Sequence, residues 1–411
     1  MNFELFIAKR IIAGKGYKNS ISSPIIKIAT IAITLGITVM LIAVSIGSGF
    51  QKKIRDKMSG FKGHIQIVNY DNNNSDVSVV PINKHQDFYP KFHNVEGIKN
   101  VQVFANKFGV LRTENDFEGV ILKGVSDDYD FSFFNEYLVE GRLPDFSLDR
   151  NKEILISQSI ANRLHLKIHD TIQVVFSAEK RKNPFAIRKP IVVGIYNTGF
   201  EQFDKTMLIG DIREVQRLNS WDSTKVGGFE VLLDDFDALK EKGDEVYRSI
   251  GATLNSATIA ENYPLIFNWL DILDNNVWVI IGIMILVAGI NMVTALLVLI
   301  LEQVQMVGVL KALGSTNWSI RKVFLYNASY LILKGLLYGN SIGLLFLLAQ
   351  KYFKLIKLDP ENYYVSTVPV SIDFLSIILL NAGTLVLCFL MLIVPSYIIT
   401  KIQPSKSIKF A

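Results

Sequence analysis

Long apolar stretches alternate with polar sequence along this chain. Four of these stretches reach the roughly 20 residues that a helix needs to cross a bilayer. Backbone polar groups in lipid must be hydrogen-bonded within the segment, so each stretch is expected to be a helix. The stretches run from about Ile28 to Phe50, Val277 to Leu301, Val323 to Ala349 and Phe374 to Ile399, and only the third contains a charge, Lys334.

Between the first two stretches, apolar and polar residues alternate over a shorter distance along the chain. Such alternating runs are typical of half-buried strands, and two further segments, Ser157–Ile168 and Asp235–Ile250, have helical spacing. The sequence therefore predicts a membrane protein with four transmembrane α-helices and an inserted α+β extracytoplasmic domain. The expected strands are 64–70, 118–125, 152–157, 171–177, 189–196 and 227–235.

These patterns divide the chain into eight parts. A slight excess of basic residues on the side shared by the two ends favours a cytoplasmic location for both. A cleaved signal peptide remains the alternative for the first span, although its apolar core is longer than the usual 7–15 or so residues. The expected parts are 1–50 (N-terminal interfacial helix and first span), 51–276 (outer domain with stalk helices at both ends), 277–301 (second span), 302–322 (cytoplasmic loop), 323–350 (third span), 351–373 (short periplasmic loop), 374–399 (fourth span) and 400–411 (cytoplasmic tail).

Composition narrows the possible functions. The chain has 411 residues, of which 50% are hydrophobic and 20% charged, so it is too apolar to be disordered. A net charge of +5 gives no reason to expect a nucleic-acid partner. Cys388 is the only cysteine, which excludes an internal disulfide and a multi-cysteine metal site.

Motifs for common catalytic chemistry are missing. The chain has no phosphate-binding G-x-x-x-x-G-K-[ST] loop and no HExxH, paired CxxC or GxSxG sequence. Asp71–Ile82 begins like a calcium loop but lacks the central glycine and the final glutamate, so a polar surface loop is favoured. No cofactor is therefore expected on this chain, and any ATP must be bound by another subunit.

The loop between the second and third spans has a helical pattern of its own. Apolar residues recur every three positions from Val304 through Val307 and Leu310 to Leu313, and Gly314 follows. This spacing predicts a short amphipathic helix that ends at the glycine. A simple interfacial connector is the alternative interpretation.

Several segments resemble the FtsX-like ABC transporter permeases. EQVQMVGVLKALG (302–314), followed by IRKVF (320–324), resembles their coupling-helix loop, and LFIAKR (5–10) resembles their N-terminal interfacial helix. LVEGRLPDF (138–146) and the segment 153–176 are similar to the periplasmic domain of the lipoprotein-releasing (Lol-type) branch. VPSYIITKIQPSKSIKF (394–410) is similar to the closing sequence of the family, so the resemblance covers nearly the whole chain.

This resemblance implies a function and a set of partners. A chain of this kind sits in the bacterial inner membrane with its large domain in the periplasm and contacts membrane lipid. It pairs with a second permease copy, identical or different, and with a separate ABC ATPase subunit that uses ATP and Mg. Its substrate is an acylated lipoprotein, which passes to a periplasmic carrier. The residues expected to couple to the ATPase are Val304, Val307, Leu310, Lys311, Leu313 and Gly314, and those expected to line the substrate cavity are Ile37, Met40, Leu41, Val44, Met284 and Val287.

Residues flanking the spans suggest how movement reaches the outer domain. Phe50, Ile54, Met58 and Phe61 form one helical stripe after the first span, and a second stripe, Leu265, Trp269 and Ile272, precedes the second span. The two stripes could pack as a stalk or lie on the membrane surface.

The third span contains two further features. Gly335, Gly339 and Gly343 share one face and favour close packing within the bundle over a contact between copies. Lys334 is costly near the span centre, so it either has a function, with Asn291 or Asn381 as a polar partner, or snorkels toward the interface.

In the outer domain, Ser177–Pro190 separates two expected strands. Asn183, Pro184 and Phe185 make a projecting hairpin plausible. The resemblance implies a carrier-binding hook at this place, and a solvated basic hairpin is the alternative. For the whole chain, two other functions stay open: a mechanotransmitting permease that regulates a cell-wall hydrolase, and an exporter of peptides or small molecules.

Overall fold

The chain folds into two compact units. The computed structural model describes residues 3–13, 22–72, 80–113, 116–147, 152–177 and 185–402. The first unit, here called the membrane unit, comprises Met1–Phe50, Leu270–Ile356 and Val368–Ala411. The second, here called the outer unit, comprises Gln51–Trp269 and Lys357–Thr367.

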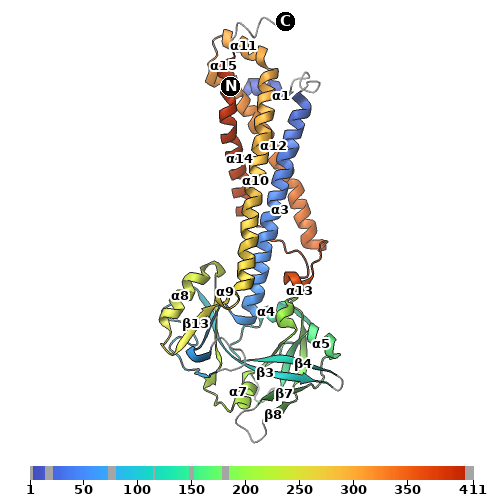
Figure 1. Cartoon of the computed structure of the whole chain (residues 1–411), viewed down its shortest axis with the longest axis vertical. Helices are drawn as coiled ribbons and strands as arrows, with labels where there is room; N and C mark the ends of the chain where they lie inside the picture. The colour runs from blue at the N-terminus through green and yellow to red at the C-terminus, as the bar shows by residue number, and fades with distance from the viewer. Residues whose placement is uncertain are drawn as a thin grey trace. The chain divides into compact units, whose positions relative to one another are not determined.

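Helices make up the membrane unit. Within the described residues, four helices are long and apolar enough to cross a membrane, which confirms the four predicted spans. The first two extend well beyond their apolar stretches, with 41 and 39 residues. The helices are α1 (Phe3–Ala13), α3 (Ser22–Lys62), α10 (Pro264–Glu302), α11 (Val304–Ala312), α12 (Asn317–Phe353), α14 (Phe374–Ser396) and α15 (Ile398–Lys401) (Figure 1).

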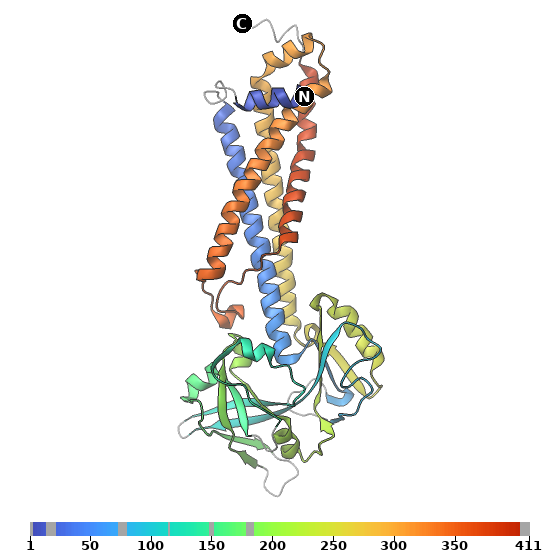
Figure 2. The same cartoon turned by 180° about the vertical axis from the view of Figure 1, so that it is seen from behind.

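Three short helices gather at one end of the membrane unit. Helix α1 lies across this end, where α11 and α15 also lie (Figure 2). The Ser319 hydroxyl at the start of α12 donates to the Glu4 carboxylate of α1, with 2.9 Å between the oxygens. The predicted N-terminal helix is thus confirmed and is fastened to the third span.

Glycines on α12 receive the side chains of α3. A Cβ added to Gly335 would lie 2.7 Å from Ile33 Cγ2, and one added to Gly339 would lie 2.8 Å from Ile37 Cβ. A Cβ on Gly343 would similarly lie 2.8 Å from a methyl carbon of Leu41. The predicted packing role of the three glycines is therefore confirmed, and the contact is made within the chain.

Strands of the outer unit form one large sheet. All six predicted strands are present, and the two predicted helical segments contain α5 (Gln158–Leu164) and α8 (Leu239–Ser249). The strand order is β13-β1-β12-β3-β4-β10-β6-β9-β5, with the β7–β8 hairpin joined to β3. The strands of this sheet are β1 (Ile65–Asn69), β3 (Ile98–Arg112), β4 (Phe117–Val125), β5 (Leu138–Gly141), β6 (Glu153–Ser157), β7 (Gln173–Ser177), β8 (Phe185–Arg188), β9 (Ile191–Tyr196), β10 (Met207–Asp211), β12 (Gly228–Leu233) and β13 (Leu254–Thr258).

Smaller elements complete the outer unit. A separate pair of short strands, β2 (Ile82–Asn83) and β11 (Lys225–Val226), lies outside the large sheet. The remaining helices cover the sheet and its loops, and Asp211 caps the start of the one that follows β10. They are η1 (Tyr70–Asn72), α4 (Ser132–Glu136), α6 (Glu201–Asp204), α7 (Ile212–Asn219), η2 (Phe236–Ala238), α9 (Ile259–Asn262) and α13 (Pro360–Tyr363).

Half of the sheet closes on itself through the long strand β3. The first part of β3 pairs with β12, and the last part, from Gly109 to Arg112, pairs with β7. A bridge between Thr171 and Ile191 then connects the start of β7 to the start of β9. The hydrogen-bonded path β3-β4-β10-β6-β9-β7-β3 is therefore continuous and forms a small barrel, here called the outer barrel.

Candidate functional site

The predicted coupling helix is present as α11. Gly314 ends it in a left-handed conformation, with φ +90°, which a residue with a side chain would adopt only under strain. The Thr316 hydroxyl then accepts the Ser319 N–H at 3.2 Å and starts α12. The short helix and its terminating glycine are thus confirmed.

The two faces of α11 have different surroundings. Val307 is fully buried in the apolar core of the membrane unit, and Leu310 packs against that core. In contrast, Val309 is 49% exposed and Leu313 is 78% exposed. The predicted stripe is therefore not one docking surface: Val307 and Leu310 hold α11 on the bundle, and Val309 and Leu313 are available to a partner. Val304 is half-buried and Gly314 is exposed.

Lys311 binds the end of the chain's last helix. Its ammonium group donates to the carbonyl oxygens of Ile399 at 2.7 Å and Ile402 at 2.9 Å. Arg321 follows shortly after α11 in the sequence, and its guanidinium group lies 3.5 Å from the ring centre of Tyr397. Two cations thus fasten the C-terminal segment to the coupling region. Lys311 was predicted in the coupling region, whereas its carbonyl partners, 88 and 91 residues further along the chain, have no local signal in the sequence.

The predicted lining of the substrate cavity is only partly exposed. Ile37, Met40 and Leu41 are buried inside the membrane unit, so the prediction that they line a cavity surface is wrong. Ile37 and Leu41 are the side chains that the α12 glycines receive, and this packing removes them from the surface. Val44 and Met284 are half-buried, and Val287 is exposed.

Other residues of α3 and α10 form exposed apolar faces. On α3, Ile31, Leu35 and Val39 follow one another at four-residue intervals, which places them on one side of the helix. A corresponding exposed series on α10 consists of Val279, Ile283, Leu286, Val287 and Ile290. These two faces are the apolar surfaces that the two helices offer to lipid, to a second chain or to an apolar substrate.

Lys334 lies on an exposed part of α12. Its ammonium group is 5.8 Å from the ring centre of Tyr338. Neither proposed amide is its partner: Asn381 exchanges hydrogen bonds with Asn340 at 2.7 and 3.0 Å, and Asn291 donates to a carbonyl of its own helix. The suggested partners are therefore wrong, whereas a function for Lys334 stays a prediction.

Only the first of the two predicted stripes is mostly buried, Phe50 and Trp269 are half-buried, and the packing of the stripes as a stalk stays a prediction. Ile54, Met58 and Phe61 are fully buried, as the first stripe requires. In the second, Leu265 is 84% and Ile272 is 58% exposed. The buried positions at the start of α10 are instead Ile266 and Leu270, which have the same spacing but lie on a different side of the helix.

Phe61 ends the first stripe inside an aromatic cluster of the outer unit. Its ring centre lies 4.7 Å from that of Phe203, 5.3 Å from Phe133 and 5.5 Å from Phe134. Edge-to-face and tilted contacts at these distances are favourable and specific. The last turn of α3 is therefore built into the core of the outer unit.

A buried ion pair lies beside this cluster. The side chains of Lys123 on β4 and Glu230 on β12 are each 1% exposed and 2.8 Å apart. Gln102 on β3 donates to the same carboxylate at 3.0 Å, and Lys123 also donates to the Phe61 carbonyl at 2.6 Å. Because a buried charge is stable only when paired and hydrogen-bonded, these groups hold the end of α3 on the sheet.

The loop between the third and fourth spans belongs partly to the outer unit. Tyr364 stacks on Phe200 with 5.1 Å between the ring centres, and its carbonyl accepts a hydrogen bond from Lys57 at 3.0 Å. The neighbouring Val365 is buried, and Lys205 pairs with Glu361. Two adjacent tyrosines in a polar loop are the only local hint of this docking in the sequence.

Asp204 organises the turn that carries Phe200. Its carboxylate accepts the Thr198 hydroxyl at 2.7 Å and the Gly199 N–H at 2.9 Å. Burial raises the pKa of Asp204 to about 6, against the lowering effect of these hydrogen bonds and of Lys57. The turn therefore contains a carboxyl group that can change its charge near neutral pH.

The predicted projecting hairpin is formed by β7 and β8. The two strands pair from Val174 and Arg188 to Ser177 and Phe185, and the Phe185 side chain is exposed. Asn183 and Pro184 lie outside the described residues. The hairpin is thus confirmed, and its role in binding a carrier stays a prediction.

The described residues offer no arrangement typical of a metal site. Among them, no group of three or more His, Cys, Asp or Glu side chains is placed to bind an ion. Cys388 is buried in α14 as a free thiol.

Two family models together cover most of the chain. Residues 28–246 match the MacB-like periplasmic core domain, and residues 278–404 match the FtsX-like permease C-terminal domain. The first match alone includes more than half of the chain, and the second includes α11 and its flanking spans.

Relatives align over nearly the full length. The lipoprotein-releasing system transmembrane protein LolE of Haemophilus influenzae is 20% identical, with 99% of each chain covered. LolC of Neisseria meningitidis is also 20% identical over 100% of this chain and 99% of that protein. LolC of Buchnera aphidicola is 22% identical over 93% and 92% of the two chains. Taken with the four spans and the inserted domain, these matches show that the chain belongs to the FtsX-like permeases with a MacB-like periplasmic core domain, which are multi-pass proteins of the bacterial inner membrane.

Proposed function

We propose that this chain is the permease subunit of an ABC transporter that extracts acylated lipoproteins from the inner membrane and passes them to a periplasmic carrier. A separate ATPase subunit, using ATP and Mg, supplies the energy, and a second permease copy completes the pair. The observation that carries this proposal is the similarity to lipoprotein-releasing transmembrane proteins over the whole chain.

The structure supports a specific place for the ATPase. Exposed Val309 and Leu313 lie on a helix whose other face is anchored in the bundle core through Val307. Exposed apolar groups on a rigidly held helix are suited to enter a groove of a partner. We propose that the ATPase binds Val309 and Leu313, and that Val307 and Leu310 pass its movement to the spans.

The acyl chains require an apolar path. In this proposal they contact the exposed faces of α3 and α10, including Leu35, Val39, Ile283 and Val287, in place of the buried residues assigned from sequence. Removing each buried CH₂ from lipid costs about 0.8 kcal/mol, so release needs both ATP energy and an acceptor. The β7–β8 hairpin, with exposed Phe185, is the proposed contact for the carrier.

A reconstituted complex tests the coupling surface. The double variant Val309→Glu/Leu313→Glu is expected to lose binding of the ATPase and lipoprotein release while remaining inserted, because it places two charges where apolar side chains would be buried against the ATPase. The conservative Val309→Ile/Leu313→Met variant serves as the matched control and keeps both activities. Full ATPase binding and release by the glutamate variant would contradict the assignment.

Native mass spectrometry of the complex from its own host tests the cargo. The expected assembly contains two permeases, two ATPases and a mass that matches a triacylated lipoprotein, and it distinguishes identical from different permease copies. An assembly with a cell-wall hydrolase and no acylated protein would instead favour the mechanotransmitter. Sensitivity to drugs or peptides after deletion, with normal lipoprotein release, would favour the exporter.

A further inference from the structure

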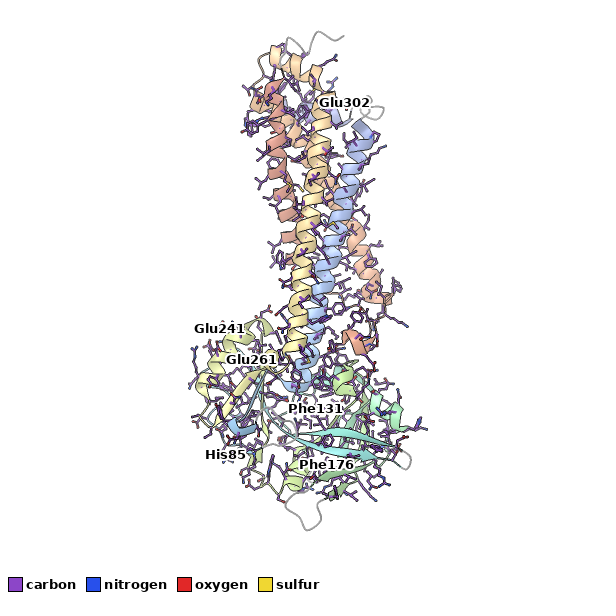
Figure 3. The ribbon with its side chains drawn as sticks, in the orientation of Figure 1. His85, Phe131, Phe176, Glu241, Glu261 and Glu302 are labelled. Atoms are coloured by element: carbon purple, nitrogen blue, oxygen red, sulfur yellow. The ribbon has the colours of Figure 1, made fainter. Side chains whose placement is uncertain are left out.

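The outer barrel has a cavity at one end. Its volume is about 600 Å³, and residues of β4, β6, β7, β8 and β10, together with α7, line it. This size lies within the range of about 300–1,000 Å³ that is usual for small-molecule sites, which often occur at barrel mouths. Figure 3 shows one of the lining residues, Phe176, among the strands of the outer unit.

The floor of the cavity is apolar. Leu122, Ile154 and Leu208 lie on three neighbouring strands, and Val174 and Phe176 face them from β7. Leu122 and Ile154 pack closely over Gly210, because a Cβ at this position would lie 2.9 Å from Leu122 Cδ1 and 3.3 Å from Ile154 Cγ2. The cavity volume of about 600 Å³ above these apolar side chains is the space that an apolar group could occupy.

Charged residues surround the opening, and its acidic groups are already paired. Glu214 accepts hydrogen bonds from two arginines, Arg188 at 2.9 Å and Arg217 at 2.8 Å. The other two acids of the lining have arginine partners outside the cavity, Glu153 with Arg142 and Asp211 with Arg213. None of the three carboxylates is therefore left to attract a cation.

Two lysines at the opening, unlike the arginines, have no carboxylate partner among the described residues. Lys152 and Lys189 are both exposed, and neither forms an ion pair with a residue that the structure describes. The Lys152 carbonyl accepts the Ile191 N–H at 2.8 Å, which brings the two lysine-bearing segments side by side. The opening thus has a net positive charge directly above an apolar floor.

We propose that the mouth of the outer barrel binds a single-chain anionic amphiphile, of which a fatty acid is the simplest example. The alkyl chain would cover Leu122, Ile154 and Phe176, and the carboxylate would lie between Lys152 and Lys189. Apolar burial supplies the affinity, and the two cations select an anionic head group. This site is separate from α11 and from the exposed faces of the spans, and it does not depend on what the spans transport.

Photolabelling of the full chain tests this site. The protein is placed in nanodiscs of phosphatidylcholine, exposed to a palmitic acid analogue that carries a diazirine, irradiated, and digested for mass spectrometry. Adducts are expected on peptides from β6, β7 and β10. The variant Lys152→Glu/Lys189→Glu is expected to lower this labelling about fivefold, because each exposed charge contact contributes modestly.

Matched controls separate the site from non-specific partition. Lys91→Glu/Lys240→Glu makes the same charge change at two other exposed lysines of the outer unit and should leave labelling of the barrel unchanged. Labelling of α14 by probe dissolved in the bilayer gives an internal standard. Equal labelling of the barrel by the corresponding fatty alcohol would overturn the proposed selection of an anion. Adducts confined to the spans, or barrel labelling insensitive to the Lys152→Glu/Lys189→Glu change, would overturn the site itself.

Discussion

The membrane unit and the outer unit bury polar groups in opposite ways. In the membrane unit, the hydroxyl of Thr38 donates to a carbonyl of its own helix at 2.8 Å and to the Gly339 carbonyl at 3.1 Å. In the outer unit, Lys123 and Glu230 form a charged pair in the core of a sheet. Helices in lipid satisfy their own backbone and need only close contact, whereas the outer unit uses buried charge to fix one end of a helix on its strands.

Breaking the buried pair is expected to have the largest effect. Lys123→Met leaves Glu230 buried without its cation and removes the donor to the Phe61 carbonyl. The outer unit should lose about 3–5 kcal/mol of unfolding free energy. Hydrogen exchange of the β1, β3 and β12 amides in the full chain measures this loss.

A double variant separates the charge from the packing. Lys123→Met/Glu230→Met removes both charges together and should recover much of the stability, since an apolar pair avoids the desolvation cost. If the double variant exchanged as fast as Lys123→Met alone, the importance of the unpaired charge would be refuted.

The corresponding test in the membrane unit changes a glycine. Gly339→Leu forces a side chain toward Ile37 and the Thr34 carbonyl, both 2.8 Å from the added Cβ, and should destabilise the bundle by about 3 kcal/mol. Gly282→Leu is the matched control, because nothing lies within 4 Å of a Cβ at that position. The measurement is the thermal midpoint of the detergent-solubilised protein. Equal midpoints for the two variants would show that α3 and α12 do not depend on this contact.

This difference between the units also explains what could be predicted from the sequence. The four spans, six strands of the large sheet and the packing of Gly335, Gly339 and Gly343 follow from local periodicity and were predicted, whereas other strands of that sheet were not. Strand β3 was missed because polar Gln102 and Asn106 occupy buried positions on it and interrupt the apolar alternation. Their place in the core depends on partners far away in sequence, such as Glu230 for Gln102, which no local pattern reveals.

The candidate site shows the same limit. The spacing of Val304, Val307, Leu310 and Leu313 predicted a helix correctly but not which side of it faces the bundle. Ile37 and Leu41 were assigned to a cavity although the glycine spacing on α12 already indicated a close neighbour. Using both patterns together would have placed these residues in the core. The docking of Tyr364 on Phe200 joins distant segments and has no such local signal.

A change of pH is expected to have a smaller effect on the stability of the outer unit. The pKa of Asp204 is raised to about 6 by burial, so the folded state binds a proton that the unfolded chain releases nearer pH 4. Its contribution to stability is therefore present at low pH and is lost as pH rises through 6. Lowering the pH from 7.5 to 5 should raise the unfolding free energy of the outer unit by about 1 to 1.5 kcal/mol. Asp204→Asn should remove this difference, which exchange of the Thr198 and Gly199 amides at the two pH values can measure. The same pH dependence in both proteins would exclude Asp204 as its origin.

Lys311 in the membrane unit and Lys123 in the outer unit have the same role, which is to hold the end of a helix in place. Each lysine donates to carbonyls at the end of a helix, Lys123 at Phe61 and Lys311 at Ile399 and Ile402. Lys311 is only partly buried and leaves no opposite charge stranded, so Lys311→Met should cost about 1 kcal/mol or less. The loss should be confined to faster exchange of the α15 amides, with the thermal midpoint nearly unchanged. Lys322→Met, at a nearby lysine without these carbonyl contacts, should leave α15 as it is. A large drop in the midpoint for Lys311→Met would mean that helix-capping geometry determines how much such a hydrogen bond contributes to stability. An effect confined to α15 would show that burial of the charge determines it.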